Sequence, residues 1–258
     1  MRVVVINLDR SPERLATFRV EAERIGLAFE RLVAVETQAN AARHGRLTAG
    51  EVGCFESHRA AWRYLVESGD PWLAVFEDDV VLAAAVTGFL AAPGRFPARA
   101  DLIKLEAFPD TVTIAPRALA FDGFALHRMR SRHRGSAGYV ISRRAAIRLL
   151  QRTEGFRRPI DVVVFDPRDE AVRGLRIHQA VPALCIQEHL LAARAGSAPL
   201  HPSLIEHSSA LVRPPPATQR QRLSREILRV GRQIAGRVNA SREAILRSRR
   251  LVVPFLEA

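Results

Sequence analysis

An apolar run at residues 72–76 constrains the fold most, because three consecutive acids follow it: Glu77, Asp78 and Asp79. A short apolar run of this kind is typical of a buried strand. The acids would then lie at the carboxyl end of the strand, the edge at which open α/β sheets bind ligands. Adjacent carboxylates repel one another unless a cation lies among them, so the run indicates a divalent cation that holds a phosphate. The alternative is a solvated loop.

Strand and helix signals alternate along the rest of the chain. Residues 2–7 are typical of a first strand, and Ser11 followed by proline begins a helix. Thr48 and Glu51 form a capping box that begins a second helix. Further strands are predicted at residues 29–35, 101–107, 124–129, 139–141, 176–181 and 184–186, and a helix at 143–151. This order predicts an α/β fold with a mostly parallel sheet flanked by helices.

The length of 258 residues allows one full core, and the net charge of +12 is unevenly distributed. Residues 213–250 hold eleven arginines and two glutamates, which supply +9 of that charge. A proline run at 214–216 marks a boundary. We therefore expect a globular domain over 1–212 and, over 213–258, a proline linker with a basic amphipathic helical tail.

The tail suits an anionic membrane surface, because apolar residues recur in it at helical spacing among the arginines. The alternative is a helix that packs on the core or on a sister subunit. No aromatic residue precedes Phe255 in the tail, so nucleic acid is not an expected partner. The chain has no bilayer-length apolar run and no signal sequence, which predicts a cytoplasmic protein, with the tail as a peripheral contact to the inner face of the membrane.

Five segments in fixed order carry a family resemblance. They are residues 6–14, 47–58, 76–79, 135–143 and 159–161. Together they resemble glycosyltransferase family 25, the lipooligosaccharide galactosyltransferases, over about residues 1–205. The resemblance implies a GT-A fold, inversion at the anomeric carbon and a UDP-sugar donor, usually UDP-galactose. It also implies a divalent metal, manganese or alternatively magnesium.

The resemblance also assigns site residues. Its metal motif falls on residues 77–79, where we expect Glu77 and Asp79 as ligands, because alternate side chains of an extended segment share a face. Asp78 would contact the donor. The remaining donor-binding residues implied by the resemblance are Asn7, Asp9, Arg14, Glu51, Ser57 and His58. For His58 the alternative is a core histidine with one hydrogen bond.

Inversion needs a base that takes the proton of the acceptor hydroxyl, and a carboxylate is the usual choice. Asp161 is our candidate, because it matches the family's Pro-x-Asp and an apolar run follows it. Its alternative role is a helix N-cap. Lys104 and Glu106 share one strand face and would line the site or face solvent. Cys54 and Cys185 lack metal-ligand spacing and are expected in the core.

The sequence therefore predicts a metal-dependent hexosyltransferase that acts on a lipooligosaccharide or another glycan acceptor. Two alternatives stay open. One is a non-catalytic relative that binds sugar or membrane. The other is a magnesium-dependent phosphotransfer domain, since acids at a strand end together with Lys104 superficially resemble such sites.

Overall fold

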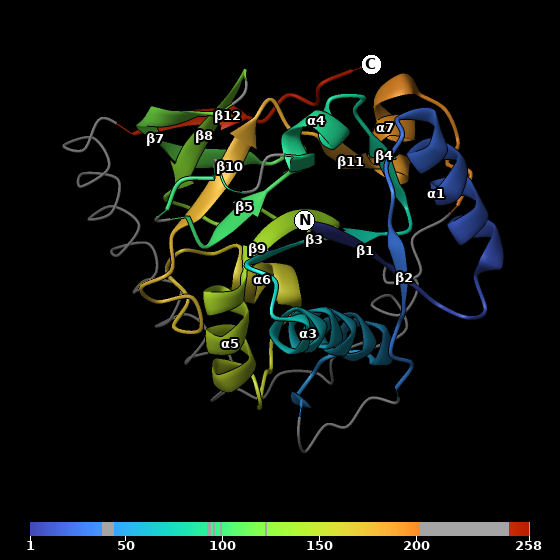
Figure 1. The fold of residues 1–258 in the computed structure, drawn as a ribbon, viewed down its shortest axis with the longest axis horizontal. Helices are drawn as coiled ribbons and strands as arrows, with labels where there is room; N and C mark the ends of the chain where they lie inside the picture. The colour runs from blue at the N-terminus through green and yellow to red at the C-terminus, as the bar shows by residue number, and fades with distance from the viewer. Residues whose placement is uncertain are drawn as a thin grey trace, which may run out of the picture.

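The computed structural model describes residues 1–37, 44–91, 94, 96–98, 100–121, 123–201 and 248–257. A nine-stranded sheet forms its centre, in the order β12-β7-β8-β10-β5-β9-β3-β1-β2 (Figure 1). Its strands are β1 (Arg2–Asn7), β2 (Glu30–Val33), β3 (Trp72–Glu77), β5 (Leu102–Lys104), β7 (Thr111–Phe121), β8 (Phe124–Met129), β9 (Gly138–Ser142), β10 (Ile177–Val181) and β12 (Arg249–Val252). A smaller sheet joins β4 (Val80–Leu82), β11 (Cys185–Gln187) and β6 (Glu106–Ala107).

Strand direction in the large sheet is mixed. Strands β2, β1, β3, β5, β10 and β7 run one way, whereas β9, β8 and β12 run the other way. The parallel trio β2-β1-β3 brings its carboxyl ends to one edge. The predicted α/β class, with a mostly parallel sheet flanked by helices, is confirmed.

Helices cover both faces of the sheet (Figure 1). Along β1, Val3 and Val5 pack in one buried cluster and Val4 and Ile6 in the other, as expected for a strand buried on both sides. The first cluster includes α1 (Pro12–Arg24) and α4 (Val86–Ala91), and the second includes α3 (Ala49–Ser68), α5 (Arg143–Arg152) and α6 (Ile160–Val164). Helix α7 (Glu188–Ala195) follows β11.

The predicted helices begin where expected, and two of the three predicted caps form. Thr48 accepts a hydrogen bond from the Glu51 amide and the Glu51 side chain bonds back, which completes the capping box of α3. The helix ends at Gly69, whose φ of 77° is left-handed. Ser142 caps α5 through the Ala145 amide. Ser11 precedes α1 without a side-chain cap bond.

The strand predicted over residues 101–107 is divided. Its first part is β5 of the large sheet and its last part is β6 of the small sheet, with Leu105 between them. Strands β4, β7 and β12 and helices α4 and α7 were not predicted. Within the described ranges, none of the helices combines the length and the apolarity needed to cross a bilayer.

The end of the chain returns to the domain. Strand β12 pairs antiparallel with β7, Val253 is buried, and Phe255 bridges to Ala183. The predicted basic helix of the tail lies in residues 202–247, outside the described residues. Its membrane role therefore stays a prediction, while the residues after it contribute to the sheet and the core.

Candidate active site

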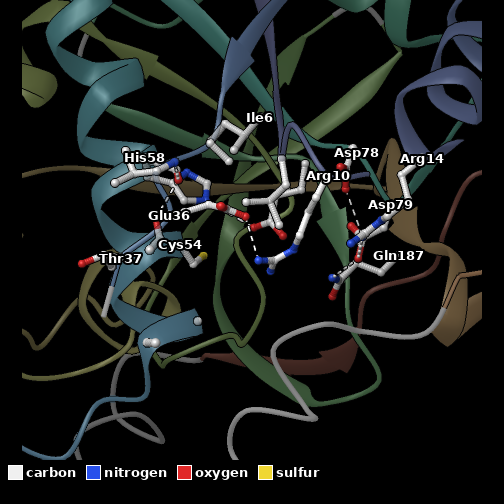
Figure 2. A pocket seen from close by; sticks show the side chains of 18 residues that line it. Ile6, Arg10, Arg14, Glu36, Thr37, Cys54, His58, Asp78, Asp79 and Gln187 are labelled. Atoms are coloured by element: carbon white, nitrogen blue, oxygen red, sulfur yellow. Dashed lines mark hydrogen bonds and ion pairs between the residues drawn. The ribbon is translucent and has the colours of Figure 1, made fainter. Parts of the chain in front are cut away.

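A cavity of about 290 Å³ opens at the carboxyl ends of β1 and β3 (Figure 2). The loop after β2, the first half of α3 and Gln187 complete its walls. The ten residues predicted for the metal, the donor or catalysis fall into two groups by position. Those that line the cavity are Arg14, Ser57, His58, Glu77, Asp78 and Asp79. Asn7, Asp9, Glu51 and Asp161 are not among its lining residues.

Strand pairing positions the acids. In the parallel pair β1-β3, Ile6 lies beside Glu77, so Asn7 comes next to Asp78. The Asn7 side chain donates to Asp78 Oδ2 at 2.7 Å. After Glu77 the chain turns into β4, so the alternation expected from an extended segment does not continue. Glu77 turns toward α3, whereas Asp78 and Asp79 both contact Arg14.

Glu77 is anchored through one oxygen. Its Oε1 accepts from Ser136 Oγ at 2.9 Å and lies 3.2 Å from His58 Nε2. Burial raises the pKa of Glu77, whereas its interactions with His58, Ser136 and Arg14 lower it, and the pKa lies below its ordinary value. Glu77 is therefore ionised at neutral pH. Ser136 belongs to a segment quoted for the family resemblance, but its contact with Glu77 was not predicted.

Arg14 joins the other two acids. Its Nη2 lies 3.0 Å from Asp78 Oδ1 and 2.8 Å from Asp79 Oδ2. Gln187, at the end of β11, donates to the same Asp79 oxygen at 3.2 Å. Burial raises the pKa of Asp78, against the opposing effect of Arg14 and Asn7. Burial and then the charge of Glu77 raise the pKa of Asp79 to about 7.

Asp79 fits a divalent cation. Its Oδ1 is buried and has no hydrogen-bond partner in the described chain. Buried polar atoms are seldom left unpaired, and a hard cation would both pair this oxygen and relieve the repulsion from Glu77. The donors are carboxylate oxygens of the kind that manganese and magnesium prefer. The residues present therefore fit the implied metal, with Asp79 Oδ1 as the available ligand.

A different trio brings its ligand atoms closest together. Among the described residues, Cys54, His58 and Glu77 place a sulfur, a nitrogen and an oxygen within 4.8 Å of one another, whereas the three acids do not form such a group. Burial, followed by the charges of Glu77 and Asp161, raises the pKa of the Cys54 thiol well above its ordinary value. Metals bind the thiolate, so this environment opposes binding at Cys54. His58 Nε2 already faces Glu77.

Several residues predicted to bind the donor hold the framework of the site. Asn7 also donates to the Ser11 carbonyl and accepts from Arg31. Asp9 is exposed and pairs with Arg31. Ser57 Oγ donates to the Gly53 carbonyl and accepts from the Val35 amide, which ties α3 to the loop after β2.

One ion pair crosses the cavity. Arg10 Nη1 lies 2.7 Å from Glu36 Oε1, and both side chains are more than half exposed (Figure 2). An exposed pair contributes about 0–1 kcal/mol, so it opens readily. Because Arg14 is engaged with two acids, Arg10 is the better placed of the two arginines for an incoming diphosphate.

Asp161 lies in the first turn of α6, after Pro159 at the N-cap position. Its Oδ1 accepts from the Val162 amide at 2.8 Å, and its Oδ2 from the Gly135 amide at 3.4 Å. Asp161 is therefore not the N-cap residue. The other carboxylate of this region, Asp166, bonds to Arg168 and is a turn residue.

Lys104 and Glu106 neither line the cavity nor face solvent. They form a fully buried pair, with 2.7 Å between Nζ and Oε2, and burial raises the pKa of Glu106 to about 7 against the effect of Lys104. Glu106 accepts from the Ala137 amide, and Lys104 donates to the Gly135 carbonyl. The pair holds the turn that carries Ser136. Of the cysteines, Cys185 is buried as predicted, whereas Cys54 lines the cavity.

The chain is similar to known glycosyltransferases. Glycosyltransferase family 25 (LPS biosynthesis protein) matches residues 1–164. A lacto-N-neotetraose biosynthesis glycosyltransferase LgtB of Neisseria gonorrhoeae is 32% identical, over 97% of this chain and 98% of its own length. An LgtB of Neisseria meningitidis serogroup A is 34% identical, over 82% of this chain and 80% of its own.

A lipooligosaccharide biosynthesis protein, lex-1 of Haemophilus influenzae, is 31% identical over 55% of this chain and 50% of its own length. The family match covers well over half of the chain and includes β1, α3 and the acids after β3. It agrees with the resemblance and with the expectation of an enzyme. The chain belongs to glycosyltransferase family 25.

Proposed function

We propose that the protein is a metal-dependent, inverting glycosyltransferase of lipooligosaccharide biosynthesis, with a UDP-hexose as donor, galactose as the hexose and a glycan or glycolipid as acceptor. The observation that carries this proposal is the acid-lined cavity with one unpaired buried oxygen, Asp79 Oδ1. The similar LgtB and lex-1 proteins, which are named for lacto-N-neotetraose and lipooligosaccharide biosynthesis, support the acceptor class.

Different residues of the cavity would bind the metal, the diphosphate and the nucleoside. When bound, a divalent metal would neutralise the charge that grows on the departing diphosphate. Asp79 Oδ1 would hold it, with Glu77 beside it, and Arg14 keeps Asp78 and Asp79 oriented. Arg10 would leave Glu36 and pair with a phosphate. The loop after β2 and the first half of α3 would enclose the nucleoside.

Asp161 is the proposed base. The Gly135 amide orients its carboxylate, and the same turn presents Ser136 to Glu77, so one short segment links the base to the metal side of the site. Asp161 would take the proton of the acceptor hydroxyl as that oxygen attacks the anomeric carbon from the face opposite the diphosphate.

The proposed location is the cytoplasm and the inner face of the cytoplasmic membrane, with the arginine-rich residues after Pro216 as the contact to anionic lipid. This location would bring the nucleotide-sugar and a membrane-borne acceptor to one place.

A donor panel tests the proposed function. UDP-galactose, UDP-glucose, UDP-N-acetylglucosamine and GDP-mannose are incubated with the protein and a soluble lactose-type or N-acetylglucosamine-type acceptor, with manganese and with chelator. We expect transfer from UDP-galactose only with metal, and a β-linked product from the α-linked donor. Equal turnover in chelator, or retention of the α configuration, would contradict the metal or the inverting assignment.

A further inference from the structure

A buried row of hydrogen bonds ends at Glu77. Trp62 Nε1 lies 2.9 Å from Tyr139 Oη, which lies 2.9 Å from His58 Nδ1, and His58 Nε2 lies 3.2 Å from Glu77 Oε1. Helix α3 supplies His58 and Trp62, four residues apart on one face, and β9 and β3 supply the other two. His58, Trp62 and Tyr139 have no solvent exposure.

The chemistry of the donors fixes the direction of this row. An indole nitrogen can only donate, so Trp62 donates to the Tyr139 oxygen. The hydroxyl hydrogen of Tyr139 then needs an acceptor, and within the described residues His58 Nδ1 is the one in reach. His58 therefore accepts at Nδ1 and carries its proton on Nε2, which donates to Glu77.

The other protonation states fit worse. With a proton on Nδ1, His58 would donate to Tyr139 and leave the buried hydroxyl hydrogen unbonded, an outcome that folded proteins avoid. If Nδ1 carried the only proton, a nitrogen lone pair would also face the Glu77 carboxylate. Only the Nε2–H tautomer satisfies Trp62, Tyr139 and Glu77 together.

From this we propose that His58, held as the Nε2–H tautomer by Tyr139 and Trp62, is a positioning residue for Glu77. Together with Ser136 it fixes Oε1 of this carboxylate, which lines the cavity. No group in the described chain bonds to Oε2, which leaves that oxygen available for a ligand. The kinetic part of this inference rests on the proposed function, whereas the tautomer does not.

Nuclear magnetic resonance of the full chain with ¹⁵N-labelled histidine tests the tautomer without any activity. Long-range correlations between ring nitrogens and carbon-bound protons distinguish a protonated Nε2 from a protonated Nδ1, and His58→Gln assigns the signal. We expect one His58 form with the proton on Nε2. A proton on Nδ1 or on both nitrogens would overturn the proposal, as would direct ligation of added Zn²⁺ by Nε2 in place of the bond to Glu77.

Two substitutions test the positioning role. His58→Leu removes the donor at similar volume, whereas His58→Gln keeps an N–H close to the position of Nε2. Outer-shell partners of metal ligands are worth about 10–100-fold in metal affinity or activity. We expect His58→Leu to raise the manganese concentration for half-maximal UDP binding and turnover by that factor. His58→Gln should need a manganese concentration close to that of wild type. Equal behaviour of the two variants would overturn the role.

Ser136→Ala is the safeguard if His58→Leu does not fold, because it removes the second donor to the same oxygen by deleting a single hydroxyl. It should shift the manganese requirement in the same direction. An unchanged requirement would count against anchoring of Glu77 through Oε1. If wild-type protein shows no turnover with any donor, the proposed function fails, and the resonance experiment still decides the tautomer.

Discussion

Replacing Asp79 with asparagine should stabilise the metal-free protein above pH 7 and at the same time strongly reduce metal-dependent turnover. Asparagine keeps the size of the side chain and an oxygen for Arg14, but it removes the charge. Burial, with the charge of Glu77, places the pKa of Asp79 at about 7 in the folded protein, against an ordinary 3.8. At about 1.4 kcal/mol for each pH unit, ionised Asp79 costs at most about 4 kcal/mol of folding free energy.

The direction in which stability changes with pH follows from proton binding to Asp79. Below pH 3.8 the carboxyl is protonated in both the folded and the unfolded chain, so it has no effect on stability. Between 3.8 and about 7 the folded chain binds more protons than the unfolded chain, so stability falls as the pH rises. Above pH 7 the full cost is present. Asp79→Asn should therefore match wild type at pH 3.5 and exceed it at pH 8.

Urea unfolding at several pH values, in chelator and in manganese, measures this effect. Manganese should stabilise wild type at pH 8 and leave Asp79→Asn unchanged, and kcat/KM of the variant should fall by about 10²–10³, equal to several kcal/mol of lost transition-state stabilisation. A variant less stable than wild type at pH 8, or a stability difference independent of pH, would show that ionised Asp79 does not destabilise the folded protein.

Three further predictions follow from single features. Asp161→Asn should lower kcat by ~10²–10⁴ with UDP affinity unchanged in calorimetry, and an equal loss of affinity would make Asp161 structural. Gly135→Ala should lower the free energy of unfolding in urea by at least about 2 kcal/mol more than Gly26→Ala. A Cβ at Gly135 would lie 2.3 Å from Glu106 Oε1. Gly26 is the matched control, because it also has a positive φ but has open space around it. Vesicles with anionic lipid should sediment the full chain less as salt rises. Each tail arginine changed to glutamine should lower the binding free energy by ~1 kcal/mol. If a variant with several such changes sediments like wild type, the tail is not the membrane contact. The arginines to change are Arg222, Arg225, Arg229, Arg232 and Arg237.

Substitution is preferable to truncation for the tail. A chain cut near Pro214 would also lose β12 and the buried Val253. Loss of membrane binding in such a truncation could not be separated from damage to the sheet.

Elements with local signals were predictable. The capping box of α3 and the apolar run of β3 depend on residues close in sequence, and both form where expected. Strand β12 was not predicted, because it pairs with β7 across more than a hundred positions of the chain. Strand β7 also pairs with its neighbour β8, and this local hairpin was missed. Leu105 separates β5 from β6 for a similar reason: each part pairs with a different sheet.

The site was predictable in kind but not in arrangement. The acids and Arg14 stand in segments quoted for the family resemblance, and they do line one cavity. Their grouping depends on the turn after Glu77, which ends the strand alternation and brings Asp78 and Asp79 to Arg14. Gln187 comes to Asp79 from a strand of the second sheet, and no local pattern in the sequence indicates that contact.

Anomalous diffraction from crystals grown with manganese and UDP would locate the metal at the cavity without reference to turnover. We expect one manganese peak within direct bonding distance of Asp79 Oδ1, in the cavity at the ends of β1 and β3, with the diphosphate beside it. Crystals of Asp79→Asn should lack that peak. A manganese ion bound instead by Cys54 and His58, or UDP seated in the cavity with no metal near Asp79, would contradict this expectation.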